Sequence, residues 1–390
     1  MTRSYAELCE LFRPQLENVF LYLAGLDSEI ATPIGQVGLT QLVETCLSAS
    51  YFSDRSWKYQ AILVATQAAQ KLLGALDRQR LLAMITMRRM ALAHLFQESG
   101  QEQMPDTFPV VDDRSHAFTA DLAIVRAAEC VKLNALASAS KHLADFVPEW
   151  NDRVSSLGVI KKEQIAFAQA GVLRCEGRFH EAYDILCHLS RDHRKTVALL
   201  GRVLCELGQY DEALRQLHLH LSTKASSRGV VSVELALAYA YVFRCMQGMI
   251  ERNFLDRHAL QASRETFQKL SSMPFRDTYY GKMNRLSVLF GLAMVDHLDS
   301  RVESALDAWR AALVASRESL PTGYTDMIIS YSTGELEARR GGAAQSDVLV
   351  NYARTLFSRT GRQHHFVSLG SLWLDLLGKW FKALGKDPID

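Results

Sequence analysis

Histidines are the residues of this chain whose type and spacing most invite a search for metal chemistry. They form two close pairs, His218 with His220 and His364 with His365. Residues two apart on a helix point in nearly opposite directions, so His218 and His220 cannot hold one metal ion together. The adjacent pair opens the last predicted helix and is interpreted as solvent-exposed. We therefore predict no metal site.

Nucleophilic and redox chemistry finds equally little support in the sequence. The 7 cysteines are spaced too widely for a C-x-x-C motif, and most lie in apolar helical patterns. They are interpreted as buried, reduced thiols of an intracellular protein, cytoplasmic or nuclear. No phosphate-loop, dinucleotide-binding, H-E-x-x-H or G-x-S-x-G motif occurs. We predict no cofactor and no catalytic site of a familiar type.

The composition indicates a globular, helix-rich protein. The chain is 48% hydrophobic and 22% charged, with a formal net charge of +1, which argues against long disorder and against a dedicated nucleic-acid-binding protein. Proline accounts for only 8 of 390 residues. No apolar run approaches the roughly 20 residues that a membrane span needs, so a membrane protein is not expected.

Apolar residues recur with helical periodicity along the whole chain, for example over residues 8–23, 55–74 and 78–97. We expect about sixteen to eighteen helices and no convincing strand. The one long break, residues 97–116, contains two prolines and a glycine. It is predicted to be a mobile insertion between helices.

A short motif recurs in the middle of the chain. Residues 176–183 (EGRFHEAY) return as residues 207–214 (LGQYDEAL), an offset of 31 residues, and a weaker copy lies at residues 302–306. A fixed period of this length predicts stacked helical hairpins. Small residues are twelve positions apart in all three copies, where two helices would cross closely: Ala170 with Ala182, Gly201 with Ala213, and Ala293 with Ala305.

The motif also predicts how each hairpin turns. Gly177 and Gly208 stand where a first helix would end, because glycine tolerates the left-handed conformation of such an end. Phe179 and Tyr210 would begin the second helix. A glutamate follows in its first turn, where the helix dipole favours negative charge.

These residues resemble the tetratricopeptide repeat (TPR) family, clearly over residues 160–222 and weakly over 285–318, where one extra residue is expected to disrupt the turn. The resemblance implies an all-α fold, a right-handed α-solenoid of TPR-like helical hairpins. It also implies that a concave groove binds peptides or protein partners. The family's groove-facing positions fall on Gln164, Phe167, Arg174, Lys195, Ala198 and Arg202.

Three of these groove positions are basic. Arg174, Lys195 and Arg202 would form a strip that prefers an acidic or carboxylate-bearing segment, since guanidinium groups match carboxylates. The alternative is that they are ordinary solvated charges. Phe167 and Gly171 stand where chaperone-binding members of the family carry lysine and asparagine, so that clamp is not expected.

The last predicted helix, within residues 364–390, carries a continuous stripe of leucine, tryptophan and phenylalanine. We interpret it as a capping helix packed on the final hairpin. A seam for homo-oligomer formation and binding to a membrane surface are the alternatives. The predicted organisation is an N-terminal helical hairpin region over residues 1–150, TPR-like repeats over 151–363, and this cap.

The sequence thus favours a non-catalytic scaffold or adaptor that binds a protein or peptide segment, with no nucleic acid. A regulatory sensor that responds to a peptide or small ligand is the first alternative. The second is an enzyme of unfamiliar type, with a site under the 97–116 loop.

Overall fold

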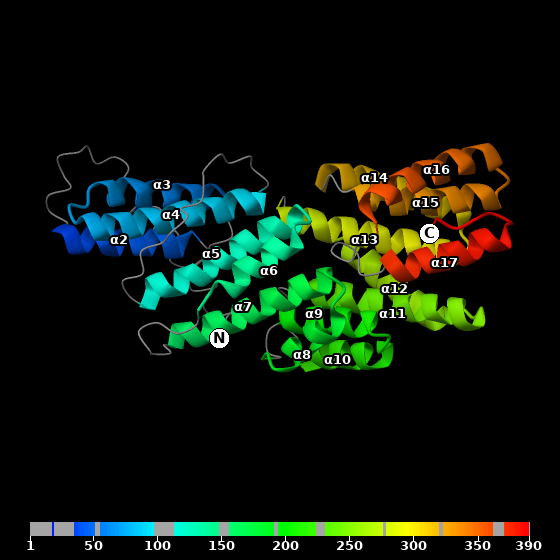
Figure 1. Ribbon diagram of the computed structural model, residues 1–390, viewed down its shortest axis with the longest axis horizontal. Coiled ribbons are helices and arrows are strands. Elements are labelled where there is room, and N and C mark those ends of the chain that lie inside the picture. The colour runs from blue at the N-terminus through cyan, green and yellow to red at the C-terminus, as the bar shows by residue number, and fades with distance from the viewer. Residues whose placement is uncertain are drawn as a thin grey trace. The chain divides into compact units, whose positions relative to one another are not determined.

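The computed structural model describes residue 18 and residues 35–50, 55–96, 113–147, 156–190, 194–223, 231–275, 278–319, 323–361 and 370–389. These ranges contain sixteen helices, α2 to α17, and no strand (Figure 1). The predicted all-α class is confirmed. None of the described helices is long and apolar enough to cross a membrane.

The chain divides into two compact units, which are described separately below. Residues 1–125 and 147–161 form the first, and residues 126–146 and 162–390 form the second. The domain boundaries predicted after residues 150 and 363 stay predictions. Residues 113–116, which were expected to be loop, belong to helix α5, whereas residues 97–112 lie outside the described part of the chain.

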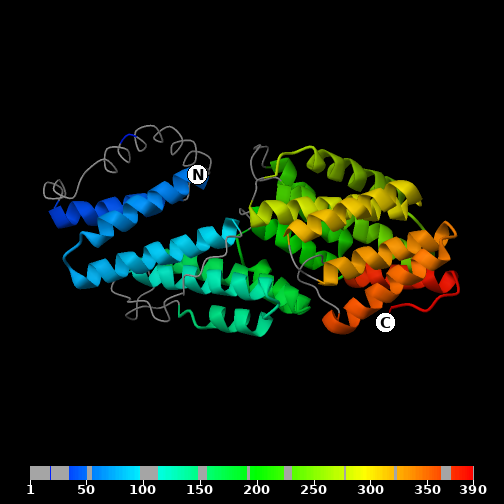
Figure 2. The same ribbon diagram turned by 90° about the horizontal axis from the view of Figure 1, so that it is seen from above.

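The first unit contains α2 (Gly35–Ala49), α3 (Arg55–Gln70) and α4 (Ala75–Phe96), which pack on one another (Figure 2, blue to light blue). Their shared core is built around Val43, Trp57 and Leu81. Two cations cap the carboxyl end of α2. Lys58 Nζ and Arg88 Nη2 donate to the backbone oxygen of Ser50, at 3.2 and 2.7 Å. Positive charge is favourable there because helix-end carbonyls lack partners within the helix.

Successive helical hairpins build the second unit, which also receives the end of α5. The pairs are α5 (Asp113–Lys132) with α6 (Leu136–Ala144), α7 (Ser156–Cys175) with α8 (Phe179–Cys187), α9 (Arg194–Glu206) with α10 (Tyr210–Thr223), α11 (Val231–Arg252) with α12 (Arg257–Ser271), α13 (Tyr279–Leu298) with α14 (Val302–Ser319), and α15 (Gly323–Arg339) with α16 (Ala343–Thr360). Helix α17 (Gly370–Ala383) follows them.

The same turn joins the helices in five of these hairpins. Between α7 and α8, the backbone N–H of Arg178 donates to Leu173 O and that of Gly177 to Arg174 O, which is the Schellman motif. Gly177 has a φ of +78°, as the sequence predicted. The other left-handed residues at this turn position are Asn134, Gly208, Ser300 and Gly341.

The weak sequence copy therefore has the regular turn. Ser300 occupies the glycine position with a φ of +58°, and α14 begins two residues later, as the second helix does after Gly177 and Gly208. The expectation of one extra residue in this turn is wrong. The motif was hard to recognise here because serine, unlike glycine or asparagine, does not indicate a left-handed backbone position.

The small residues lie where the paired helices approach. Ala170, Ala182, Ala213, Ala293 and Ala305 are all fully buried. A Cβ atom on the buried Gly201 of α9 would come within 2.9 Å of Leu217 Cδ1 on α10. The close crossing predicted for this hairpin is confirmed.

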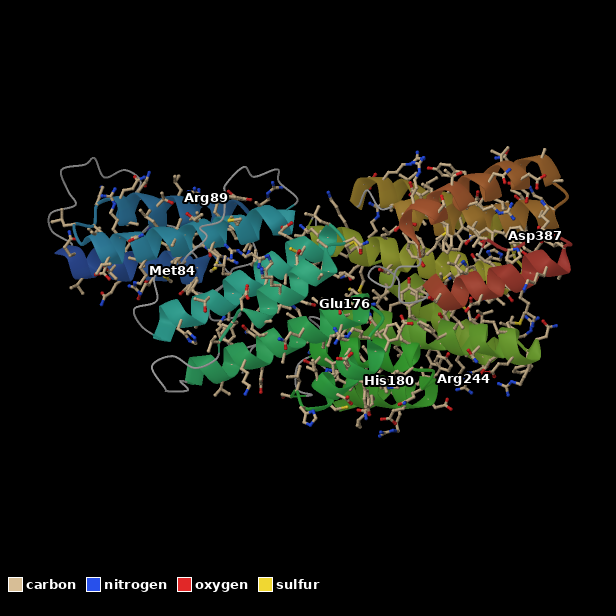
Figure 3. The ribbon with its side chains drawn as sticks, viewed as in Figure 1. Met84, Arg89, Glu176, His180, Arg244 and Asp387 are labelled. Atoms are coloured by element: carbon tan, nitrogen blue, oxygen red, sulfur yellow. The ribbon has the colours of Figure 1, made fainter. Side chains whose placement is uncertain are left out.

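Polar contacts also tie neighbouring hairpins together. Ser140 Oγ of α6 donates to Glu176 Oε1 at the end of α7, at 3.0 Å (Figure 3). Arg244 of α11, labelled in the same view, pairs with Asp211 of α10 at 3.2 Å. The ion pair is exposed and contributes little energy, whereas the hydrogen bond is partly buried.

Candidate functional site

First helices of the middle hairpins pack on one another in the second unit and form a layer. Helix α9 packs on α11, and α11 packs on α13, while α8, α10, α12 and α14 each pack against the first helix that follows. The charge of Arg174 on α7 acts on Arg202 of α9, which in turn lies near Tyr239 of α11. We call the side of α7, α9 and α11 that carries these three residues the first-helix face.

Two arginines of like charge converge on this face. Arg174 is buried, with 7% of its surface exposed, and Arg202 is partly buried. Burial, together with the positive charge of Arg174, lowers the pKa of Arg202 to about 10. The side chain still carries its charge at neutral pH, because this pKa stays well above 7.

Arg202 makes no hydrogen bond and no ion pair with any residue in the described part of the chain. Other shielded arginines of the second unit are paired. Arg264 lies 2.9 Å from an oxygen of Asp299 and 3.2 Å from one of Asp296, and Arg339 Nε lies 2.5 Å from Glu335 Oε1. Arg202 thus departs from the usual rule that a shielded charge has a partner.

The side chain of Tyr239 is held in place by contacts with α12 and α13. Its hydroxyl donates to the backbone oxygen of Ser287 on α13, at 2.5 Å. Its ring meets the ring of Phe267 edge to face, with centroids 5.1 Å apart. Burial raises the pKa of the Tyr239 hydroxyl, which therefore stays protonated. The sequence gives no signal for this residue, because α11 carries no TPR motif.

The remaining predicted groove residues have different environments. Gln164 and Lys195 are exposed, and neither makes a hydrogen bond or ion pair with the described residues. Phe167 packs against the core of the second unit, and Ala198 is buried with 4% exposure. The structure therefore shields Arg174 and Arg202 to different degrees, and leaves Gln164 and Lys195 at the surface.

The histidines considered for metal binding have other roles where the structure describes them. His218 Nε2 lies 2.8 Å from the hydroxyl oxygen of Tyr241, and His220 is buried. His364 and His365 lie outside the described residues. Within the described ranges, no group of three or more His, Cys, Asp or Glu side chains could hold a metal ion.

Helix α17 packs across the first helices of the last three hairpins (Figure 1, red). Trp373 Nε1 donates to Ser332 Oγ of α15 at 2.8 Å, and Trp380 stacks on His297 of α13 with centroids 5.1 Å apart. Lys379 Nζ donates to the backbone oxygens of Met249 and Ile250 at the end of α11, at 2.8 and 3.1 Å.

The apolar stripe of α17 is consequently used within the chain. Trp373, Leu376, Leu377 and Phe381 are completely buried. The helix was expected on the final hairpin, and it contacts α15 there, but it also reaches α11. Self-association through this helix stays a prediction, and it would need a face other than the buried stripe.

No family model and no curated protein matches the sequence. Among solved structures, the chain is similar to a Rap protein complexed with Competence and Sporulation Factor. The TM-score is 0.50 at 9% sequence identity, over 90% of this chain and 99% of that chain. At this identity the similarity concerns the fold alone, and it supports a TPR-like helical repeat.

Proposed function

We propose that this chain is a non-catalytic interaction protein that binds a segment of a partner, a protein tail or a free peptide, on the first-helix face of α7, α9 and α11. Helix α17 is the observation that carries the proposal. It is an amphipathic segment held across the first helices α11, α13 and α15. The fold thus already binds one helical segment with this layer of helices.

The free part of the layer has the polarity of a binding surface. Gln164 and Lys195 are exposed, and Arg202 is partly buried without a carboxylate partner among the described residues. Positive charge on this face favours an acidic segment. Lys195 would steer such a partner from solvent, and the two arginines would hold it.

A regulatory sensor is the second candidate, and the partly buried Arg202, which has no partner among the described residues, favours it. A ligand that binds only the folded form stabilises that form in proportion to its concentration and affinity. The similar Rap structure is of a protein complexed with a factor, which agrees with either version of the proposal.

The proposal is tested by selecting binders from a displayed library of random linear peptides with the full chain. Enriched peptides should be acidic, and their affinity is then measured by fluorescence anisotropy. The double variant Gln164→Glu, Lys195→Glu should bind them several-fold more weakly, because both changed side chains are exposed on the first-helix face.

The matched control is Lys382→Glu, which reverses an exposed charge on α17, away from the first-helix face. It should leave peptide affinity unchanged. A library that yields no binder, or binders that the double variant and the control affect equally, would contradict the proposed function.

A further inference from the structure

We infer that α17 acts as an internal ligand, and that a partner's amphipathic helix with two tryptophans seven residues apart replaces it on α11, α13 and α15. We call the surface of these three helices that α17 covers the α17 seat. The inference goes beyond the proposed function, which concerns the first-helix face of α7, α9 and α11. Its test uses no selected peptide, so either proposal can fail while the other stands.

The position of α17 in the fold is the first observation. The stack of hairpins is built by contacts among the hairpins themselves, such as α9 on α11, α11 on α13 and α14 on α15. Helix α17 lies across this layer: it packs on α11 and α15, and Trp380 stacks on His297 of α13 (Figure 1, red). It follows α16 in the chain and opens no further hairpin among the described residues. Such a helix can leave while the hairpins stay folded, because contacts in a helical repeat protein are made between neighbours.

Two tryptophans make the most specific contacts in the α17 seat. The ring of Trp373 meets the imidazole of His297 edge to face, with centroids 5.2 Å apart, and Trp380 stacks on the same imidazole at 5.1 Å. Trp373 Nε1 also donates to Ser332 Oγ, and the guanidinium of Arg339 lies 4.4 Å from the centre of the Trp380 ring. A spacing of seven residues is two helical turns, which puts both rings on one face of α17. A replacing helix needs this pair.

The α17 seat is polar for a surface that α17 covers. Ser332, His297 and Glu335 are completely buried beneath or beside the helix. In a core that stays closed, apolar residues of similar volume often stabilise a protein as well as buried ionic groups do. The polar groups can bind water when α17 leaves, which lowers the cost of an open seat. Leaving is still rare, because the apolar stripe of α17 returns to water as well.

Replacement is therefore the balanced step. A partner helix with the same face restores the contacts that α17 gives up, so it has to overcome only the advantage of tethering. A tethered segment competes at an effective concentration of order millimolar. The apparent affinity for a free helix is lowered to the fraction of chains whose seat is open. Weakening α17 within the chain should consequently tighten the binding of a free helix.

The probe is a fluorescent synthetic peptide with the sequence of residues 370–387, added to the full chain and followed by anisotropy. Lys379→Met is introduced in the chain alone, where it removes the two bonds to backbone oxygens at the end of α11. The peptide keeps its lysine, so only the competing helix is weakened. This variant should bind the peptide about fivefold more tightly than the wild type does, the factor expected for about 1 kcal/mol.

The matched control is Lys382→Met, which changes an exposed lysine of α17 without that contact. It should bind the peptide as the wild type does. A second peptide, with Trp373→Ala and Trp380→Ala, should bind about tenfold more weakly or worse. Absence of binding to every chain, equal binding by the two variants, or equal binding of the two peptides would overturn the inference.

Hydrogen exchange then measures replacement in the wild type. The chain is isotope-labelled, so that its masses differ from those of excess unlabelled peptide. Amides of α17 in the chain should exchange faster when the peptide is bound, because the displaced helix loses its contacts, whereas those of α15 should not. Unchanged or slower exchange of α17 would place the peptide elsewhere and overturn the inference. Dimers that the peptide dissociates would assign the seat to a second copy of this chain, and would overturn the role of a partner.

Discussion

His297 Nε2 lies 2.7 Å from Glu335 Oε2, and both side chains are completely buried. The other ring nitrogen, Nδ1, accepts from Trp309 Nε1 at 3.4 Å. An indole N–H can only donate, so Nδ1 carries no proton and the imidazole is neutral, with its proton on Nε2. The Glu335 charge is compensated by Arg339, 2.5 Å away.

This arrangement predicts a loss of stability in mild acid. Burial lowers the pKa of His297 below its ordinary value of 6.5, although the bond to Glu335 opposes the shift. As the pH falls through 6.5, the unfolded chain binds a proton at this residue before the folded chain does, so the free energy of unfolding decreases. Urea unfolding measured at successive pH values between neutral and mildly acidic should show this decrease.

The variant His297→Gln keeps one donor and one acceptor but cannot titrate. It should be less stable than the wild type near neutral pH and should lose less stability on acidification. His258→Gln, which replaces an exposed histidine of α12, is the control and should keep the pH dependence of the wild type. An unchanged pH slope in His297→Gln would show that the acid response arises elsewhere.

Lys379 connects α17 to the end of α11, and this contact should contribute to the stability of the protein. Its ammonium group binds two carbonyl oxygens at the end of α11, whereas Lys382, three residues later, is exposed without such a contact. We expect Lys379→Met to lower the free energy of unfolding by about 1 kcal/mol, since two hydrogen bonds and a favourable helix-end charge are lost. Lys382→Met should change it little. Equal effects in denaturant titrations would argue against the attachment.

Gly291 marks the tightest approach between two hairpins. A Cβ atom there would lie 2.1 Å from Phe267 Cζ of α12, a contact that only a shift of the ring or of α13 could relieve. Gly291→Ala should therefore cost about 1–3 kcal/mol, despite the better helix propensity of alanine. At Gly171, also within a helix, nothing lies within 4 Å. Gly171→Ala should be neutral or stabilise by about 0.5–1 kcal/mol.

The common turn predicts opposite effects at equivalent positions. Ser300 is left-handed without being glycine, so Ser300→Gly should stabilise the protein by up to about 1 kcal/mol. Gly208 occupies the same position with a φ of +74°, and Gly208→Ala should cost about 1 kcal/mol. Thermal unfolding of the two variants checks the signs, and a loss of stability in Ser300→Gly would be inconsistent with the shared turn.

Local features of the sequence determined the fold class and the hairpins. The motif around Gly177 and Gly208 predicted where helices end, because turn conformation depends on a few neighbouring residues. The paired small residues predicted close crossings for the same reason, since helix geometry fixes which positions face each other across a short turn. The third copy was recognised only weakly, because Ser300 has the left-handed backbone conformation that glycine usually supplies at this position.

Only the tertiary structure decided which residues meet across hairpins. The sequence suggested one strip of Arg174, Lys195 and Arg202, but in the fold Arg174 is buried, Arg202 is partly buried and Lys195 is exposed. Tyr239, which lies near Arg202, belongs to α11, a helix without the TPR motif. The apolar stripe of α17 likewise predicted a buried helix but not the helices that cover it. An apolar face can pack on many surfaces, so only the folded chain shows that α11, α13 and α15 are its partners.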